Sequence, residues 1–555
     1  MTYEKDIPDY AMLPAKETEE HLIIPVTKGA IYSPIQVTDI TEKPKTTITI
    51  EEDILVPDTK PDLREILLID GKVRLANREI EQVNKGDDNV TVSGEVGLTT
   101  LYLPEKKEGC EPIISVQSRV PFTDQWHTGF APGGTLVMNC KVEKIDYMVI
   151  NERKYRVKIV LAIYARRYMD SKVDIFEGIS DQQIQMLKEK VEITNVALRK
   201  KDSLSIKEDL EIKEDWKVES ILKQDISIVE NYRQATSEKV VINGFILVNL
   251  LLKVSGREGA EDTDDNLQQM QEKVEFTQFI PVQQTGQWSG SSSVFDGSDL
   301  KVKPSHDEEG REVLNLEGEL VTYIELFRNI EKEIIVDAYH REKDFICDFR
   351  EEESRTLIGS TVGESSLREI ISLETIHGDV EKILYTTGEV LSGESHGEPG
   401  KVITEGTILA KIICRGQTEK GTDEMPPIFS LREEMPFRVV TTVPQIMGNE
   451  IIEEKISIKD LWAEKINGKQ IELNVTVMVS AELMRPLPFK VLENPAFEES
   501  SAKKETPRMV VYIAGPDDTL WSIAKKFKTT TESIERINNL DGSQITQGQK
   551  LLLLR

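Results

Sequence analysis

The chain has 555 residues, 39% of them apolar, and a formal net charge of −29 at pH 7. This length predicts three to five domains. The negative charge argues against nucleic-acid phosphates and anionic membrane surfaces as partners, because both would repel the chain. There is no long apolar run, and the acidic, polar start at Met1–Tyr10 is unlike a secretory signal. We therefore expect a cytoplasmic protein with no transmembrane segment and no signal peptide.

The sequence contains no recognisable catalytic, metal-binding or phosphate-binding motif. The four cysteines include no CxxC pair, so we expect free thiols in a reducing compartment. The six histidines lack metal-ligand spacing. The glycine-rich stretch 286–297 is not followed by the Gly-Lys-Ser/Thr of a phosphate-binding loop. The sequence therefore predicts a protein that is not an enzyme and holds no cofactor and no metal.

After a charged, proline-containing tail at residues 1–35, which we expect to be flexible, the chain repeats with a period near 150 residues. The predicted repeats are residues 36–170, 171–342 and 343–485. Most of their sequence alternates between apolar and polar residues, as in 155–163 and 471–479, which indicates strands with one buried face. The predicted fold is mainly β, with three tandem β-sandwich or barrel-like domains.

Three anchors recur in order in the repeats. The first is a helix-like block at Leu63–Asp70, Val218–Asp225 and Leu367–Glu374. The second is a strand that ends at Gly94, Gly244 and Gly406, and the third is a strand broken by Pro121, Pro281 and Pro436. We expect bulges or close backbone contacts at the glycines and sheet edges at the prolines. All three anchors are interpreted as folding features and not as binding sites.

Two connecting segments follow from local patterns. Ile184, Leu187 and Val191 suggest a connecting helix at about residues 180–191. Residues 486–508 hold four prolines among polar residues, which predicts a linker. Such a linker would let the last segment, residues 509–555, search for its target independently.

The last segment reads as a small βααβ unit. A strand at 510–513 precedes a helix whose apolar positions are Leu520, Ile523, Ala524 and Phe527. Either Thr519 or Asp518 can cap that helix. A second helix is expected to open at Thr529, three residues before Glu532, and a strand at 551–554 closes the unit.

This unit resembles the LysM domain, which usually binds N-acetylglucosamine polymers. The matching order is Tyr512, Asp518 to Ala524, Asn538-Asn539-Leu540, Ile545 and Gly548-Gln549. Asp517 stands where the family usually has glycine, and the chain ends without the usual Ile-Pro. The resemblance implies a glycan groove between loops 518–520 and 538–540, while the altered first loop leaves room for a protein partner. The candidate partner-binding residues are Asp518, Thr519, Leu520, Trp521, Lys525, Lys526, Asn538 and Asn539.

Some of these side chains are explained as well, or better, by packing inside the unit as by contact with a ligand. Leu520, Ile523, Ile534 and Ile537 are expected to pack inside the unit. Trp521 is as well explained by packing on the first helix as by a partner contact.

The segment Val56-Pro57-Asp58-Thr59-Lys60-Pro61-Asp62, followed by Ile66-Leu67, resembles the start of the SPOCS domain (DUF3794) of sporulation proteins. Tandem SPOCS-like repeats with one C-terminal LysM domain resemble the clostridial spore coat morphogenetic proteins. This resemblance implies binding to stage IV sporulation protein A, which lays down the basement layer of the coat. It also implies a place in the mother-cell cytoplasm, at the forespore surface.

Three hypotheses remain open. The first is a non-catalytic coat scaffold whose LysM domain docks on a basement-layer protein. The second is a peptidoglycan-binding protein that anchors the chain to spore cortex or wall. An enzyme such as a wall hydrolase ranks last, because no catalytic domain is recognisable.

Overall fold

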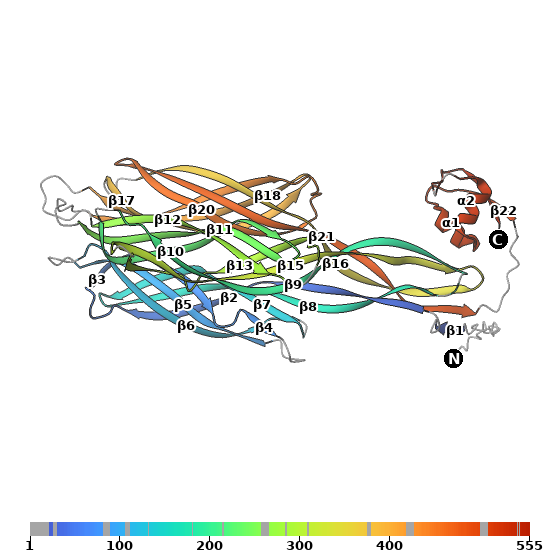
Figure 1. Cartoon of the computed structure of the whole chain (residues 1–555), viewed down its shortest axis with the longest axis horizontal. Helices are drawn as coiled ribbons and strands as arrows, with labels where there is room; N and C mark the ends of the chain where they lie inside the picture. The colour runs from blue at the N-terminus through green and yellow to red at the C-terminus, as the bar shows by residue number, and fades with distance from the viewer. Residues whose placement is uncertain are drawn as a thin grey trace, which may run out of the picture.

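The computed structural model describes residues 22–25, 30–81, 89–105, 111–130, 133–179, 181, 183–213, 216–256, 266–283, 286–307, 310–373, 379–417, 427–499, 509–540, 542 and 544–554. The molecule has a wide body, a narrow stalk of long strands, and a small helical module beside the far end of the stalk (Figure 1). It is mainly β, as predicted, with tandem β domains and two short C-terminal helices. Among the described residues, no helix has the length and apolar character to cross a membrane.

Each repeat consists of a long first strand, a three-stranded antiparallel meander, and closing strands that return to the first strand. In repeat 1 the meander runs in the order β3-β5-β6 and the other sheet in the order β2-β8-β7-β4. The strands are β2 (Ala30–Leu55), β3 (Leu63–Leu75), β4 (Glu79–Glu81), β5 (Asn89–Pro104), β6 (Ile114–His127), β7 (Thr135–Asn151) and β8 (Lys154–Ile179).

Repeats 2 and 3 follow the same plan, with meanders β10-β11-β12 and β17-β18-β19. Repeat 2 contains β9 (Ile184–Leu210), β10 (Trp216–Ala235), β11 (Lys239–Gly256), β12 (Leu267–Pro281), β13 (Gly290–Asp296), β14 (Lys301–His306) and β15 (Glu312–His340). Repeat 3 contains β16 (Asp344–Ser372), β17 (Val380–Glu398), β18 (Lys401–Gly416), β19 (Ile428–Thr442), β20 (Ile451–Asn467) and β21 (Gln470–Glu499), and β1 (Leu22–Pro25) is added to β21.

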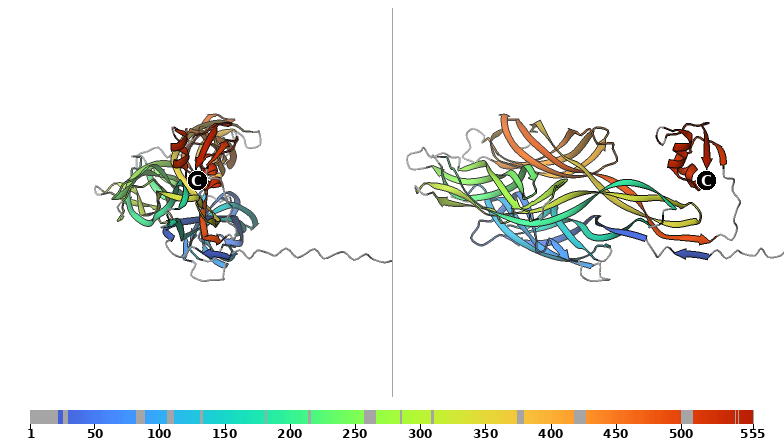
Figure 2. Two further views of the ribbon diagram at one scale, coloured as in Figure 1. Left: turned by 90° about the vertical axis from the view of Figure 1, so that its right-hand side faces the viewer. Right: turned by 45° about the vertical axis from the view of Figure 1, so that its right-hand side comes forward.

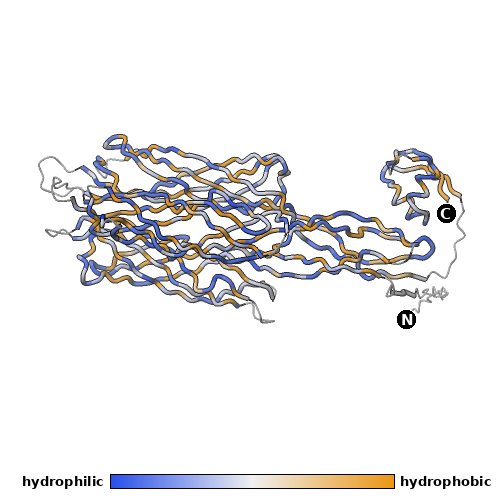
Figure 3. Tube along the Cα trace, viewed as in Figure 1, coloured by the Kyte–Doolittle hydropathy of each residue, from blue (hydrophilic) through white to orange (hydrophobic). Residues whose placement is uncertain are grey.

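The two sheets of each repeat enclose one apolar core, because alternate side chains of every strand face inward. Tyr155, Val157 and Ile159 of β8, for example, are fully buried, while the residues between them face solvent or the sheet rim. Apolar and polar residues alternate along the strands of the body (Figure 3). Viewed along the long axis, the three repeats surround a common centre (Figure 2, left).

The stalk is built from the outer halves of the first and last strands of the repeats. The pairs are β2 with β8, β9 with β15, and β16 with β21, and each pairing runs on from the body. Buried side chains from all three repeats form the stalk core: Ile35, Val37, Val173, Ile175, Val191, Ile193, Ile334, Phe489 and Val491. Each repeat therefore begins and ends in the stalk.

The first sequence anchor is a bulged strand and not a helix. Residues 63–70 lie in β3 and 218–225 in β10, and within each of these blocks the strand shifts register twice. A bulge places two residues opposite one and breaks the period of two, so apolar residues become neighbours as they do in a helix. The third counterpart shows the same two shifts, between Val380 and Lys382 and between Ile383 and Tyr385, so it lies in β17. Matching it to 367–374 was wrong, because residues 367–372 belong to β16.

The second bulge supplies the junction between the repeats. Leu67, Leu222 and Leu384 are the unpaired residues at this bulge in the three repeats. All three are buried in one apolar cluster. A cavity of about 670 Å³ lies beside this junction and is lined by residues of all three repeats, among them Asp70 and Asp225.

The glycine anchors are close backbone contacts, as predicted. A Cβ atom on Gly94, Gly244 or Gly406 would lie 2.3 Å from a carbonyl oxygen of the neighbouring strand. A phenyl ring of the third meander strand covers each position, and these rings belong to Phe122, Phe276 and Phe437.

The proline anchors lie on the edge strands β6, β12 and β19, as predicted. Their assumed equivalence is only partly correct. Gly244 pairs with Phe276, so Glu275, and not Pro281, occupies the position that corresponds to Pro121 and Pro436.

Two predicted connections are strands instead. Residues 184–191 begin β9, where they pair with β15 in the stalk and bury Ile184 and Val191. The proline-rich segment continues β21 to Glu499, where the linker was expected from residue 486. Pro486 and Pro488 are tolerated because β21 has one partner, β16, at that level, so the missing N–H groups fall on a free edge.

The predicted flexible tail also contains strand residues, at 22–25 and from residue 30 onward. Residues 1–21, Cys110 and the segment 500–508 lie outside the described residues.

Candidate docking site on the C-terminal module

The C-terminal module folds as the sequence predicts, into a two-stranded sheet and two helices. They are β22 (Met509–Ile513), α1 (Leu520–Phe527), α2 (Thr531–Asn538) and β23 (Lys550–Leu554). Thr519 is the N-cap of α1 and forms a capping box with Ser522. The cap of α2 is Thr530 and not Thr529, because Thr529 is buried and donates its hydroxyl to the carbonyl of Leu554.

Three of the eight predicted binding residues hold the module together. Leu520 is 2% exposed and packs in the core, with Ile523 and Ile534 buried beside it, as expected. The carboxylate of Asp518 accepts hydrogen bonds from the backbone N–H of Gly515 at 2.7 Å and the Tyr512 hydroxyl at 2.8 Å. These bonds, the backbone one first, lower the pKa of Asp518.

The amide of Asn538 likewise has an internal role. It donates to the carbonyl oxygens of Ile534 and Leu552 and accepts from the backbone N–H of Leu552. It thereby ties α2 to β23.

Two further predicted residues contact the chain's own stalk. The indole Nε1 of Trp521 donates to Asp337 Oδ2 at 2.8 Å, and Lys525 Nζ lies 2.6 Å from Asp337 Oδ1. The ring of Tyr339 lies edge-on to that of Trp521, with centroids 5.0 Å apart, and its hydroxyl donates to the carbonyl of Thr529 at 2.5 Å. Trp521 thus packs against the module core and also contacts the stalk of its own chain, and its contact with an external partner stays a prediction.

A third lysine completes this contact. Lys528 Nζ lies 2.6 Å from Asp344 Oδ1. We call Trp521, Lys525 and Lys528 the α1 face, and Asp337, Tyr339 and Asp344 the stalk tip. Tyr339 is 5% exposed and belongs to the apolar core cluster of the module. The stalk tip could not be predicted from the sequence, because its residues lie about 180 positions before α1 and follow no motif.

The remaining predicted residues are Thr519, Lys526 and Asn539. Lys526 is exposed, and its Nζ lies over the Tyr512 ring, 4.9 Å from the centroid. Asn539 ends α2 in the left-handed conformation, with φ 49°. Asp517 does not need such a conformation, since the described non-glycine residues with positive φ are Asn494, Lys528 and Asn539.

An exposed apolar stripe covers the outer side of the module's sheet. The side chains of Met509, Val511 and Ile513 are 60%, 66% and 59% exposed. Val510 and Tyr512, which alternate with them, pack against the module core. The sequence signal was available, because every residue from 509 to 513 is apolar, whereas a one-sided strand alternates.

The segment Val56–Asp62 forms a loop at the end of the body that is opposite the stalk. The guanidinium of Arg153 donates to the carbonyl oxygens of Lys60 and Pro57 at 2.7 and 2.9 Å. The Tyr102 hydroxyl donates to the carbonyl of Pro61 at 2.6 Å. The motif is therefore a folding feature of repeat 1.

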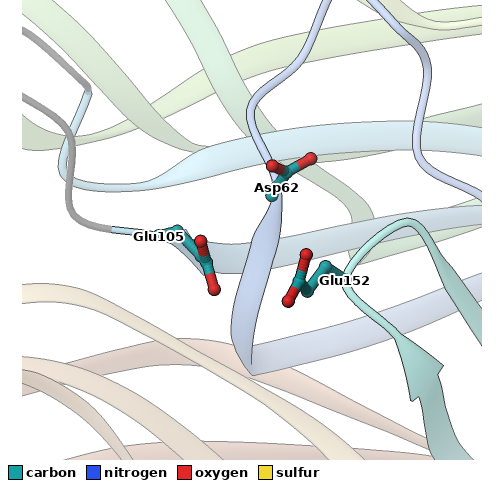
Figure 4. A group of neighbouring side chains, drawn as sticks. All are labelled: Asp62, Glu105 and Glu152. Carbon is teal, nitrogen blue, oxygen red and sulfur yellow. The ribbon is translucent and has the colours of Figure 1, made fainter.

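Asp62, Glu105 and Glu152 place carboxylate oxygens within 4.8 Å of one another near this loop (Figure 4). Asp62 also forms an ion pair with Arg153 at 3.1 Å. Exposed acidic groups of this kind are common without a metal ion, and we assign no function to them.

Two stretches of the chain match family models. Residues 45–150 match the SipL, SPOCS domain, and residues 512–553 match the LysM domain. The chain joins a SPOCS domain to a LysM domain. This architecture is the predicted one, and it fits a sporulation coat-related protein with the capacity to bind peptidoglycan. No curated protein and no solved structure matches the chain.

The SPOCS match lies within repeat 1, whereas repeats 2 and 3 share the strand order of its meander and the two bulges of its first meander strand. SPOCS and LysM domains act in binding or as scaffolds and are not known as catalytic domains.

Proposed function

We propose that this protein is a non-catalytic scaffold of the spore coat, located in the mother-cell cytoplasm at the forespore surface. Its LysM domain docks on a protein of the coat basement layer, with stage IV sporulation protein A as the partner. The observation that carries the proposal is the apolar stripe of Met509, Val511 and Ile513. Clustered exposed apolar side chains are typical of a surface that another protein covers.

The charge distribution supports a protein partner as well. The whole chain carries a net charge of −29, yet α1 presents the lysines Lys525, Lys526 and Lys528. A basic face on an acidic protein favours approach to acidic partner surfaces. In addition, this face already binds carboxylates of a protein surface, those of the stalk tip.

The second candidate function is peptidoglycan binding, which the LysM match favours. Thr519 and Asn539 lie in the two loops that would flank an N-acetylglucosamine chain. Asn539 is exposed, and Thr519 contributes its hydroxyl to the cap of α1. A glycan would use these loops and leave the apolar stripe uncovered.

The test measures binding of the full chain to stage IV sporulation protein A and, separately, its co-sedimentation with purified peptidoglycan. Val511→Asp places a charge in the stripe and is expected to weaken protein binding at least about tenfold, which is ~1.4 kcal/mol. Arg536→Gln, an exposed change on α2, serves as the control and should bind like the wild type.

Asn539→Gly keeps the left-handed backbone of the second loop but removes its side chain. Loss of peptidoglycan binding in this variant, with no binding to the coat protein in any variant, would replace the scaffold proposal by the wall-anchoring one.

A further inference from the structure

The LysM domain lies against the far end of the stalk, and five polar contacts between described residues join the two. Trp521 and Lys525 both bind Asp337, Lys528 binds Asp344 and the carbonyl of Lys343, and Tyr339 binds the carbonyl of Thr529. Helix α1 and the residues directly after it supply every module group in these contacts. The stalk tip therefore covers one defined face of the domain.

The stalk tip contributes to the domain's packing as well as to its charge pairing. Tyr339 is almost fully buried and belongs to the same apolar cluster as Leu520 and Ile534. Its edge-on contact with Trp521 is a favourable aromatic geometry. The contact thus combines an aromatic ring and two carboxylates on the stalk with an indole and two ammonium groups on α1.

The same contact is built to be reversible. Both ion pairs are solvent-exposed, with side chains between 27% and 47% exposed, and such pairs are individually weak and screened by salt. The domain also follows β21 in the same chain after residues 500–508, and so short a connection gives the contact a high effective concentration.

We propose that the stalk tip is an intramolecular clasp that closes the α1 face of the LysM domain. An external protein that presents a carboxylate beside an aromatic ring would have to displace the clasp to reach this face. The identity of that external protein rests on the proposed function. The clasp itself does not depend on it. The apolar stripe on β22 lies outside these polar contacts, so a partner can engage the stripe first and then open the clasp.

Zero-length carbodiimide cross-linking of the full chain tests the clasp, because it couples an ammonium group only to a carboxylate that it touches. We expect Lys525–Asp337 and Lys528–Asp344 cross-links in the wild type, with Lys253–Glu219 within the body, at 2.7 Å, as the internal standard. A mixture of ¹⁵N-labelled and unlabelled chains should give cross-linked peptides of a single isotope. Two outcomes would overturn the intramolecular clasp. One is a Lys253–Glu219 cross-link without the two module cross-links, and the other is cross-linked peptides that combine labelled and unlabelled chains.

Charge reversal at the stalk tip provides the matched variant. Asp337→Lys repels Lys525 and should lower the Lys528–Asp344 yield several-fold, a readout that does not involve the mutated residue. Glu333→Lys, on the same strand and paired with Lys188, should leave that yield unchanged. Equal yields in the two variants would contradict the clasp.

Adding saturating stage IV sporulation protein A should reduce both module cross-links several-fold, and Asp337→Lys should bind that protein more tightly than Glu333→Lys. If stage IV sporulation protein A binds and leaves both module cross-links intact, it does not compete with the stalk tip for the α1 face. If that protein does not bind at all, the proposed function fails and so does the competition for this partner, while the cross-links still decide the clasp.

Discussion

Lys223 of repeat 2 donates across the repeat boundary to Asp70 of repeat 1, with 2.6 Å between Nζ and Oδ2, and also lies 2.9 Å from Oδ1 of Asp225. The lysine side chain is 2% exposed. The corresponding positions in repeats 1 and 3 are Leu68 and Tyr385, and the Tyr385 hydroxyl donates to Asp225. One charged side chain thus takes the place of an apolar or aromatic one and joins repeats 1 and 2, while Tyr385 of repeat 3 bonds the same Asp225.

Replacing this lysine by an apolar residue of similar length should loosen the junction. Lys223→Met removes the buried ammonium group between two partly buried carboxylates, of which Asp70 keeps Lys411 at 2.6 Å. The expected cost is therefore at most the roughly 3–5 kcal/mol of breaking a fully buried pair. Urea denaturation of the full chain measures the loss. Lys190→Met removes an exposed pair with Glu331 and should cost less than about 1 kcal/mol. Equal effects of the two substitutions would show that the junction does not depend on Lys223.

The same junction predicts a pH dependence. Burial raises the pKa of Asp70, but Lys223 and Lys411 lower it more, so its net pKa lies below the ordinary value. A depressed carboxyl pKa stabilises the fold above the unfolded-state pKa of about 3.9, and this contribution is lost as the pH falls through the folded-state value. The wild type should therefore exceed Asp70→Asn in unfolding free energy by a constant amount above about pH 5, and by less below about pH 4. A difference that grows in acid would contradict this assignment.

Two glycines on β5 differ in the space that is available for a side chain, which allows a controlled comparison. A Cβ on Gly94 would lie 2.3 Å from the carbonyl oxygen of Arg74, whereas a Cβ on Gly97 would have its nearest neighbour at 3.9 Å. Gly94→Ala should therefore destabilise repeat 1 by about 1–3 kcal/mol or more, while Gly97→Ala should stay within about 1 kcal/mol of the wild type. Denaturation curves of the two variants give the comparison, and similar stabilities would rule out the close contact.

The thiol of Cys414 is buried, and burial raises its pKa to about 12. Only the thiolate reacts with alkylating agents, so at pH 8 its labelling by iodoacetamide should be at least about 1,000-fold slower than that of free cysteine. Mass spectrometry of the native chain measures the rate, and labelling in urea shows that the residue is competent. Fast labelling in the native state would mean that repeat 3 opens readily.

The alternation of apolar and polar residues predicted the strands and the sandwich cores, because a period of two has one simple physical reading. The two β-bulges of the first anchor were not predicted, because that block was interpreted as helix-like. At Ile66-Leu67-Leu68 the bulge places three apolar residues in a row, and this run serves two cores, since Ile66 faces its own repeat while Leu67 and Leu68 face the junction. A local sequence pattern cannot distinguish an apolar residue that packs against a distant repeat from one that lies on the buried face of a helix.

The LysM domain shows the same limit at its candidate docking site. Its helices, its first cap and its core were predicted, because they depend on residues that are close in sequence. The contact of Trp521 and Lys525 with Asp337 could not be predicted, because it depends on where repeat 2 turns into repeat 3. Asn538 was predicted as a contact because of its place in the motif. In the structure its side-chain amide bonds the backbone of Leu552 and so links α2 to β23.

The return of each repeat to the stalk has a consequence for synthesis on the ribosome. Ala30 pairs with Ile179 and Ile184 with His340, so the first strand of a repeat lacks its partner until almost the whole repeat has been translated. Pairings of such high contact order form slowly and leave strand edges open meanwhile. The exposed lysines and glutamates along these strands, such as Lys190 and Glu331, would keep the waiting edges from joining those of other nascent chains.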